Sequence, residues 1–217
     1  LKPASSVELM LKVASADDET LRKAAFEGLE SIEEFVIDQG FFQIVKARNR
    51  LARMLGYEDY YDMRLQTTEG FDKPHLFGLL DDLEERTREV NERYVAEVRA
   101  EKGEEALKPY NFRYSTQGSA IKDLDPYMQF PDALERWGRS FAALGITFER
   151  ARLQLDLVVR KGKYENGFCH APVPPFEDAE GRVRAEVNFT SNAVPGQIGA
   201  GQRAAKTLFH EGGHAAH

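Results

Sequence analysis

The sequence predicts a mainly α protein with a small antiparallel β-sheet that immediately precedes a final helix. Three observations favour this fold class. Apolar residues recur at helical spacing over the first two-thirds of the 217 residues. Near residue 153 the period changes to two, which is typical of strands. The last residues return to helix-forming sequence that contains no proline.

Helical periodicity predicts four helices in the first hundred residues, over 20–39, 41–55, 57–65 and 74–103. Gly56 ends the second of them as a C-terminal glycine does. Pro74 opens the last, because proline at the first helical position sacrifices no intrahelical hydrogen bond. The face of that helix that is dense in Glu and Arg is expected to be solvated.

The stretch from residue 108 to residue 126 has few periodic apolar residues and is expected to be a connection. Another helix is expected over residues 132–144. The side chains expected to face inward from it are Leu134, Trp137, Phe141 and Leu144.

Alternating apolar and polar side chains predict strands around residues 153–158 and 183–189, with a short strand at 166–170 that Pro172 stops. An edge strand in this sheet can hold an extended peptide by adding it to the sheet. A sheet that only packs and touches no peptide is the alternative. The candidate peptide-binding residues are Asn166, Gly167, Phe168, Cys169 and His170.

The final helix carries the motif His210-Glu211-Gly212-Gly213-His214. Residues four apart lie on one helical face, about 6 Å apart along the axis, so His210 and His214 can bind one zinc ion. Glu211 is then placed to act as general base toward a water molecule. A fraying helix end without metal is the alternative reading of the same residues.

Other residues near the motif are interpreted with it. Gly212 and Gly213 each cost a helix interior about 1 kcal/mol relative to alanine, which suggests that something packs closely there. His217 lies about 10 Å along the axis from His210, so it is expected to support a ligand or pack in the core. A catalytic zinc site needs three protein ligands. We expect the third in a continuation of the chain beyond His217.

Composition excludes several classes of protein. The net charge of −7 argues against a nucleic-acid surface, and no apolar run approaches the roughly 20 residues of a membrane-spanning helix. A single cysteine, Cys169, rules out an internal disulfide framework and favours a cytoplasmic location. Its neighbour His170 cannot form a catalytic dyad with it on a strand, since adjacent side chains point to opposite faces. The glycine-rich stretch 195–201 does not fit the P-loop pattern.

Four stretches, in order, resemble the thimet oligopeptidase and oligoendopeptidase F family of zinc metallopeptidases. They are residues 47–57, Asp125-Pro126-Tyr127 with residues 141–146, Leu155-Asp156-Leu157 with Arg160-Lys161-Gly162-Lys163-Tyr164 and Gly167-Phe168-Cys169, and Asn188-Phe189-Thr190 with residues 207–214.

The resemblance implies a helical oligopeptidase architecture, a channel that admits short peptides, and hydrolysis of their internal bonds. It carries the zinc ligands over to His210 and His214 and the base to Glu211, and it places a third ligand, a glutamate, on a later helix. Residues 1–108 are then a helical region, and residues 109–217 are the N-terminal part of the catalytic region. Its partners are short peptides and the rest of the same protein, with no nucleic acid and no membrane.

Two further expectations follow, one from a departure from the family's pattern and one from the missing third zinc ligand. Gly212 stands where the family commonly has a bulky aromatic residue, which is expected to loosen local packing. Residues 1–217 by themselves are expected to bind zinc poorly and to be inactive. A different class of function, a helical peptide-binding relative that has lost its metal, stays open.

Overall fold

The computed structural model describes residues 4–217, and the chain forms two compact units. Unit 2 is Glu27–Lys108. Unit 1 combines the residues up to Phe26 with Pro109–His217. The expected division into residues 1–108 and 109–217 concerns domains, and it stays a prediction.

Unit 2 is helical, as the sequence predicts. Helix α2 (Glu19–Asp38) continues into it from unit 1, and the other elements are α3 (Phe41–Met54), α4 (Tyr60–Arg64), a π-helical turn (Leu65–Glu69), α5 (Lys73–Lys102) and a 3₁₀ turn (Glu104–Leu107). The fourth helix of the chain starts later than residue 57 because the side chain of Asp59 caps it by accepting a hydrogen bond from the amide of Asp62 at 2.9 Å.

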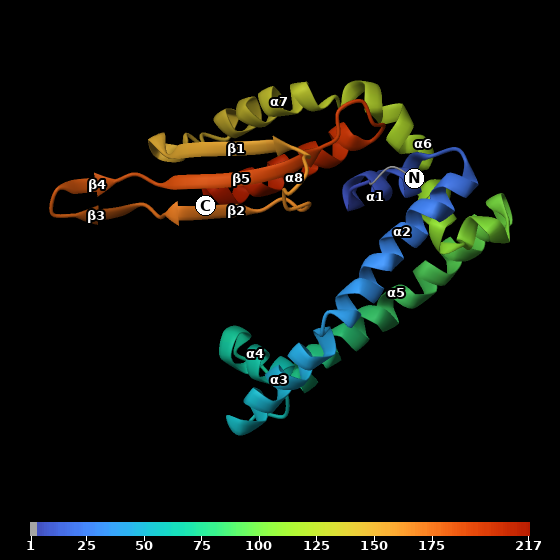
Figure 1. The fold of residues 1–217 in the computed structure, drawn as a ribbon, viewed down its shortest axis with the longest axis horizontal. Helices are drawn as coiled ribbons and strands as arrows, with labels where there is room; N and C mark the ends of the chain where they lie inside the picture. Colours follow the sequence, from blue (N-terminus) through green and yellow to red (C-terminus); the bar gives the residue numbers. More distant parts are fainter. Residues whose placement is uncertain (1–3) are drawn as a thin grey trace. The chain divides into compact units, whose positions relative to one another are not determined.

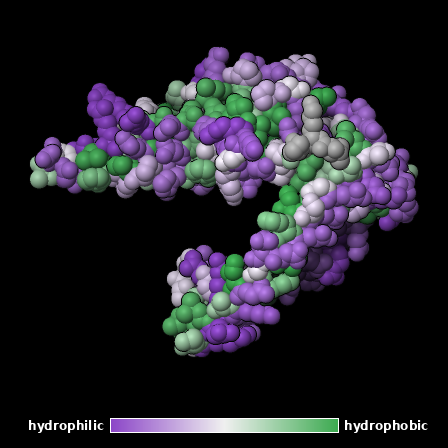
Figure 2. Space-filling model, in the orientation of Figure 1, coloured by the Kyte–Doolittle hydropathy of each residue, from purple (hydrophilic) through white to green (hydrophobic). Residues whose placement is uncertain are grey.

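Large apolar side chains remain exposed on these helices, among them Phe35, Phe42, Met54, Leu83 and Val90. Figure 2 shows hydrophobic residues at the surface of this helical unit.

No helix within residues 4–217 combines the length and the apolar composition that crossing a bilayer requires.

Unit 1 contains a helix that the sequence analysis missed and one that it wrongly treated as a connection. Helix α1 (Ser6–Ser15) begins with a capping box between Ser5 and Glu8. Helix α6 (Pro109–Leu124) lies where a connection was expected, and it packs against α1. The prediction was wrong because α6 is held by polar contacts, and its buried residues are Asn111 and Gly118 rather than an apolar stripe.

The main polar contact is made by Arg22, which is buried at the start of α2. Its Nε and Nη2 donate to Oδ1 of Asn111 on α6 at 3.0 and 2.9 Å. Its Nη1 donates to the carbonyl oxygens of Ala16 and Asp17, and its guanidinium lies over the ring of Tyr114. A buried arginine that is satisfied in this way joins the N-terminal residues to α6.

The sheet of unit 1 is mixed, so the expected antiparallel sheet was wrong in part. Its strands are β1 (Arg152–Val158), β5 (Glu186–Ala193) and β2 (Cys169–Val173), in that order, and a separate hairpin pairs β3 (Phe176–Asp178) with β4 (Gly181–Val183). β5 pairs antiparallel with β2 but parallel with β1. The chain reverses twice between β1 and β5, so these two strands run in the same direction (Figure 1).

A lysine in the loop after β1 links the parallel strands β1 and β5 by hydrogen bonds. Nζ of Lys163 donates to the carbonyl oxygens of Asp156, Val158 and Ser191, at 2.7, 3.0 and 2.6 Å. It also lies 3.2 Å from Oδ1 of Asp156. One buried ammonium therefore satisfies acceptors on both strands.

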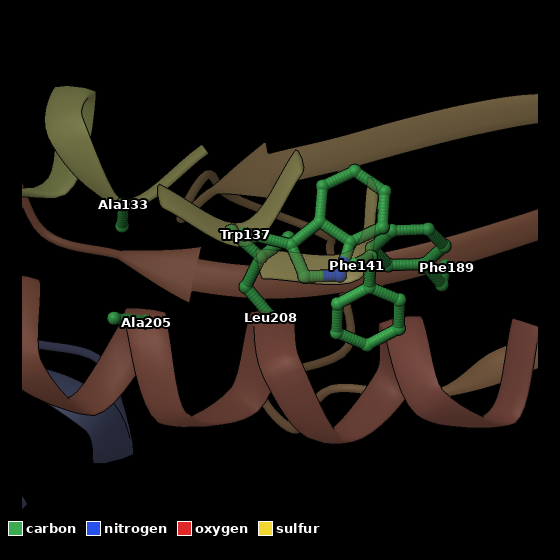
Figure 3. Packing of buried hydrophobic residues seen from close by; sticks show 6 residues of the cluster. All are labelled: Ala133, Trp137, Phe141, Phe189, Ala205 and Leu208. Atoms are coloured by element: carbon green, nitrogen blue, oxygen red, sulfur yellow. The ribbon is translucent and has the colours of Figure 1, made fainter. Parts of the chain in front are cut away.

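The core of unit 1 lies between α7 (Phe130–Ala143), the sheet and α8 (Ala200–Ala216). Figure 3 shows Leu208 projecting from α8 toward the rings of Trp137, Phe141 and Phe189. The ring centroid of Trp137 is 5.5 Å from that of Phe141 and 5.6 Å from that of Phe189. These rings and Leu208 form one apolar cluster against α8, the helix that carries the His210–His214 motif.

Two of the four side chains expected to face inward from α7 do so. Trp137 and Phe141 are buried, but Leu134 and Leu144 are 40% and 75% exposed. The buried stripe recurs every four residues from Ala133 to Phe141, so Leu134 and Leu144 lie beside it.

Candidate active site

Helix α8 positions the motif by burying its opposite face. Leu208 and Ala204 are buried, and they hold the helix against α7, β5 and β2. The side chains of His210 and His214 lie one turn apart on the exposed face, whereas Glu211 is buried. The local helical period alone thus places both imidazoles together.

The two imidazoles face one another. Nε2 of His210 lies 3.2 Å from Nε2 of His214, and the ring planes are nearly perpendicular, at 84°. Two nitrogens bound to one tetrahedral zinc ion at about 2.0–2.1 Å are about 3.3 Å apart. The separation of the two Nε2 atoms therefore suits two ligands of one zinc ion. Among the side chains that the structure describes, no cluster of three His, Cys, Asp or Glu residues is arranged to hold a metal.

Glu211 points toward the segment that leads into β2. A Cβ built on Gly167 would lie 3.2 Å from Oε1 of Glu211. Burial raises the pKa of the Cys169 thiol, and the negative charge of Glu211 raises it further. The distance from Gly167 places the Glu211 carboxylate beside residue 167, and its charge acts on the Cys169 thiol.

The five candidate peptide-binding residues divide between two faces. Gly167 and Cys169 are half-buried and lie toward α8, while Asn166, Phe168 and His170 are exposed. Hydrogen bonds to Thr190 hold the segment in register: the amide of Thr190 donates to the carbonyl oxygen of Phe168 at 2.9 Å, and the amide of Phe168 donates to Oγ1 of Thr190 at 3.2 Å. The structure thus brings two of the five residues to Glu211.

Gly167 allows this close approach. A Cβ at this position would lie 2.2 Å from Cγ2 of Thr207 and 2.9 Å from the carbonyl oxygen of Thr190. Contacts that short do not occur for real Cβ atoms. Only glycine lets the segment lie against α8 at the level of Glu211.

Gly212 has the same property on the other side of α8. A Cβ there would lie 2.1 Å from Nε1 of Trp137, so the indole occupies the space of the missing side chain. The expected loosening at Gly212 was therefore wrong, whereas the expected close packing is confirmed at this position. Nothing lies within 4 Å of a Cβ on Gly213.

A family model described as "Peptidase family M3" matches residues 12–217. This chain belongs to peptidase family M3. The match confirms the resemblance to the thimet oligopeptidase family; the closer likeness to oligoendopeptidase F stays a prediction. A search of curated proteins found no match. Peptidases of family M3 are metallopeptidases that act on peptides, and they are zinc-dependent in general.

Two cavities of this M3 chain are lined in part by α8, the helix that carries the motif. The first has a volume of about 680 Å³ and includes Gly167, His210 and Glu211 in its lining. The second, of about 600 Å³, includes Cys169, His214 and the exposed His217. His217 therefore lies with His214 on the second cavity, and its role stays a prediction.

The sequence analysis missed polar residues of the first cavity. Arg113 and Gln117 come from α6, and Gln202, Arg203 and Lys206 come from α8. Pro109, at the first position of α6, was the sequence signal for that helix. No sequence pattern indicates that its side chains face α8, because the two helices meet only in the folded chain.

Proposed function

We propose that this M3 chain contributes the His-Glu-x-x-His part of a zinc endopeptidase that hydrolyses internal bonds of short peptides. The observation that carries the proposal is the 3.2 Å separation between Nε2 of His210 and Nε2 of His214. That spacing suits two ligands of one tetrahedral zinc ion. The family membership supports the same chemistry.

His210 and His214 would hold the ion together with a third protein ligand; the described side chains include no group of three His, Cys, Asp or Glu residues arranged for it. When bound, zinc supplies Lewis acidity toward a water molecule and toward the carbonyl of the peptide bond. Since two ligands hold zinc less well than three, we expect residues 1–217 by themselves to bind it weakly and to be inactive.

Glu211 follows the first ligand by one residue and shares the first cavity with His210. Its side chain lines this cavity, where a water molecule can reach the carboxylate. In the proposed mechanism Glu211 accepts a proton from the attacking water and delivers it to the leaving amine.

The peptide is proposed to lie along β2, which is an edge strand of the three-stranded sheet. Main-chain pairing with an edge strand binds peptides of many sequences, because it uses groups that every residue has. Gly167 and Cys169 would then lie under the peptide near Glu211. With one cysteine in the sequence, we place the protein in the cytoplasm.

The decisive experiment measures zinc content and peptidase activity together in the full-length protein. His210→Ala and His214→Ala are expected to lose stoichiometric zinc and the hydrolysis of an internally quenched peptide. His75→Ala is the control, since it removes an exposed imidazole from α5, which carries no part of the motif, and it is expected to keep both.

The competing function is a peptide-binding scaffold without metal. It predicts no stoichiometric zinc in the wild-type protein, and peptide binding that is indifferent to a chelator. That pair of results would reject the peptidase proposal.

A further inference from the structure

Three cationic side chains line the same cavity as His210 and Glu211. Arg113 projects from α6, and Arg203 and Lys206 project from α8. Within the described part of the chain, none of the three forms an ion pair with a carboxylate. The cavity therefore has a positively charged end and, at the motif, the carboxylate of Glu211.

Arg203 is the most enclosed of the three. It is half-buried, and its Nη1 lies 3.2 Å from the sulfur of Met10, which is a weak acceptor. Burial lowers the pKa of its guanidinium, and the positive charge of Arg113 lowers it further. Two like charges in one partly desolvated hollow are stabilised by an anion.

The acidic group whose charge acts on Arg203 does not supply that anion. Glu165 opposes these effects on the pKa of Arg203, but its Oε2 already accepts hydrogen bonds from the amide of Ser6, at 3.0 Å, and from the hydroxyl of Ser6. It is held at the start of α1 and makes no ion pair with Arg203 among the described residues. Apart from the contact of its Nη1 with Met10, no hydrogen bond of the Arg203 guanidinium is found among the described residues, so its other N–H groups can bind a ligand.

The distance along α8 relates this positive end to the motif. Arg203 precedes His210 by seven residues, which corresponds to about 10 Å of helix. An extended peptide advances about 3.3 Å per residue. A group bound at Arg203 would therefore lie about three residues from a peptide bond held at His210 and Glu211.

We propose that Arg113 and Arg203 form a subsite for a carboxylate of the peptide, about three residues from the bond that is hydrolysed. Guanidinium groups suit carboxylates because they donate two parallel hydrogen bonds. The carboxylate is either the C-terminus of the peptide or an Asp or Glu side chain. The register rests on the proposed function; the binding of the carboxylate does not.

The test is calorimetric binding to full-length protein carrying Glu211→Gln, which prevents turnover. Three N-acetylated octapeptides of otherwise uncharged residues serve as probes: a free acid, its C-terminal amide, and the amide with one glutamate. The free acid or the glutamate peptide is expected to bind about tenfold more tightly than the plain amide, and whichever does so identifies the source of the carboxylate.

Arg203→Gln and Arg113→Gln are each expected to abolish that preference. Arg113 is exposed, so its variant tests the subsite even if Arg203→Gln impairs folding. Arg136→Gln is the matched control, because Arg136 is also an arginine near a methionine sulfur, at 3.7 Å, but lies outside the cavity lining. It should leave the preference unchanged.

Equal binding of all three peptides, no binding of any, or a preference that survives both arginine substitutions would overturn the subsite. Hydrolysis is scored separately, by mass analysis of the same peptides incubated with wild-type protein. A carboxylate preference without hydrolysis would reject the peptidase proposal and leave the subsite standing.

Discussion

The indole of Trp137 occupies the place that a side chain at Gly212 would take, since a Cβ on Gly212 would lie 2.1 Å from Nε1 of Trp137. The indole also contacts Phe141 and Phe189. The helix that carries His210 and His214 therefore packs against the core at a position where only glycine leaves room for the indole.

Gly212→Ala is therefore expected to destabilise the protein by about 1–3 kcal/mol, because the new methyl group displaces the indole from a packed cluster. Thermal and denaturant unfolding measure the effect. Gly213→Ala is the matched control: its Cβ meets nothing within 4 Å, and alanine favours a helix over glycine by about 0.5–1 kcal/mol.

A second substitution separates steric overlap from other causes. In a Trp137→Leu background, which opens space beside Gly212, the alanine at position 212 should be less destabilising. The proposed overlap would be refuted if both glycines tolerated alanine equally.

Glu211→Gln is expected to keep stoichiometric zinc and to lower kcat by about 10²–10⁴-fold, the usual contribution of a general base. The amide preserves the shape of the side chain but cannot accept the proton. Zinc analysis and hydrolysis of a quenched peptide are the measurements. Glu135→Gln, at an exposed glutamate of α7, should leave both unchanged. Near-normal turnover by Glu211→Gln would end the assignment of Glu211 as base.

Gly167→Ala is expected to lower peptidase activity by about tenfold to a hundredfold, because the methyl group forces residues 166–168 away from α8 and Glu211. Zinc content should fall much less than kcat. Adding Thr207→Ser removes the methyl group that lies 2.2 Å from the new Cβ and should restore part of the activity.

The control for this series is Gly138→Ala, since a Cβ on Gly138 meets nothing within 4 Å. If that variant and Gly167→Ala behaved alike, close packing at Gly167 would have no part in the activity.

The pairing of Asp156 with Arg160 leads us to expect that the stability of the protein falls in acid. Nη1 of Arg160 donates to both of its carboxylate oxygens at 2.7 and 2.6 Å, and this bonding holds the pKa of Asp156 below its usual 3.8. Between the folded and the unfolded pKa the unfolded chain binds more protons, so stability rises with pH in that window. The stabilisation is complete above about pH 4 and is lost as the pH falls through the lowered pKa.

Asp156→Asn should therefore lower Tm at neutral pH, and the difference from wild type should shrink below pH 4. Melting curves from pH 2 to pH 7 measure it. A difference that stayed constant down to pH 2 would contradict the proposed linkage.

Much of the local structure could be predicted from the sequence. The helix expected over residues 20–39 differs from α2 by one residue at each end, and the helix expected over 41–55 differs from α3 by one residue at its C-terminal end. These predictions succeed because helical periodicity and terminal glycines are local signals. The prediction failed for α6, where burial of Arg22 against Asn111 contributes stability that no apolar period reveals. It failed in part for the sheet, since alternation marks a strand but not its neighbour.

The sequence by itself determined that two imidazoles share one helical face with a glutamate beside the first, because four residues make about one turn of any α-helix. Only the tertiary structure decided what surrounds them: Trp137 in the space left by Gly212, Gly167 against Glu211, and Arg113 opposite Arg203 in one cavity. These contacts join residues far apart in the chain, and they depend on how helices and strands pack, which local pattern does not encode.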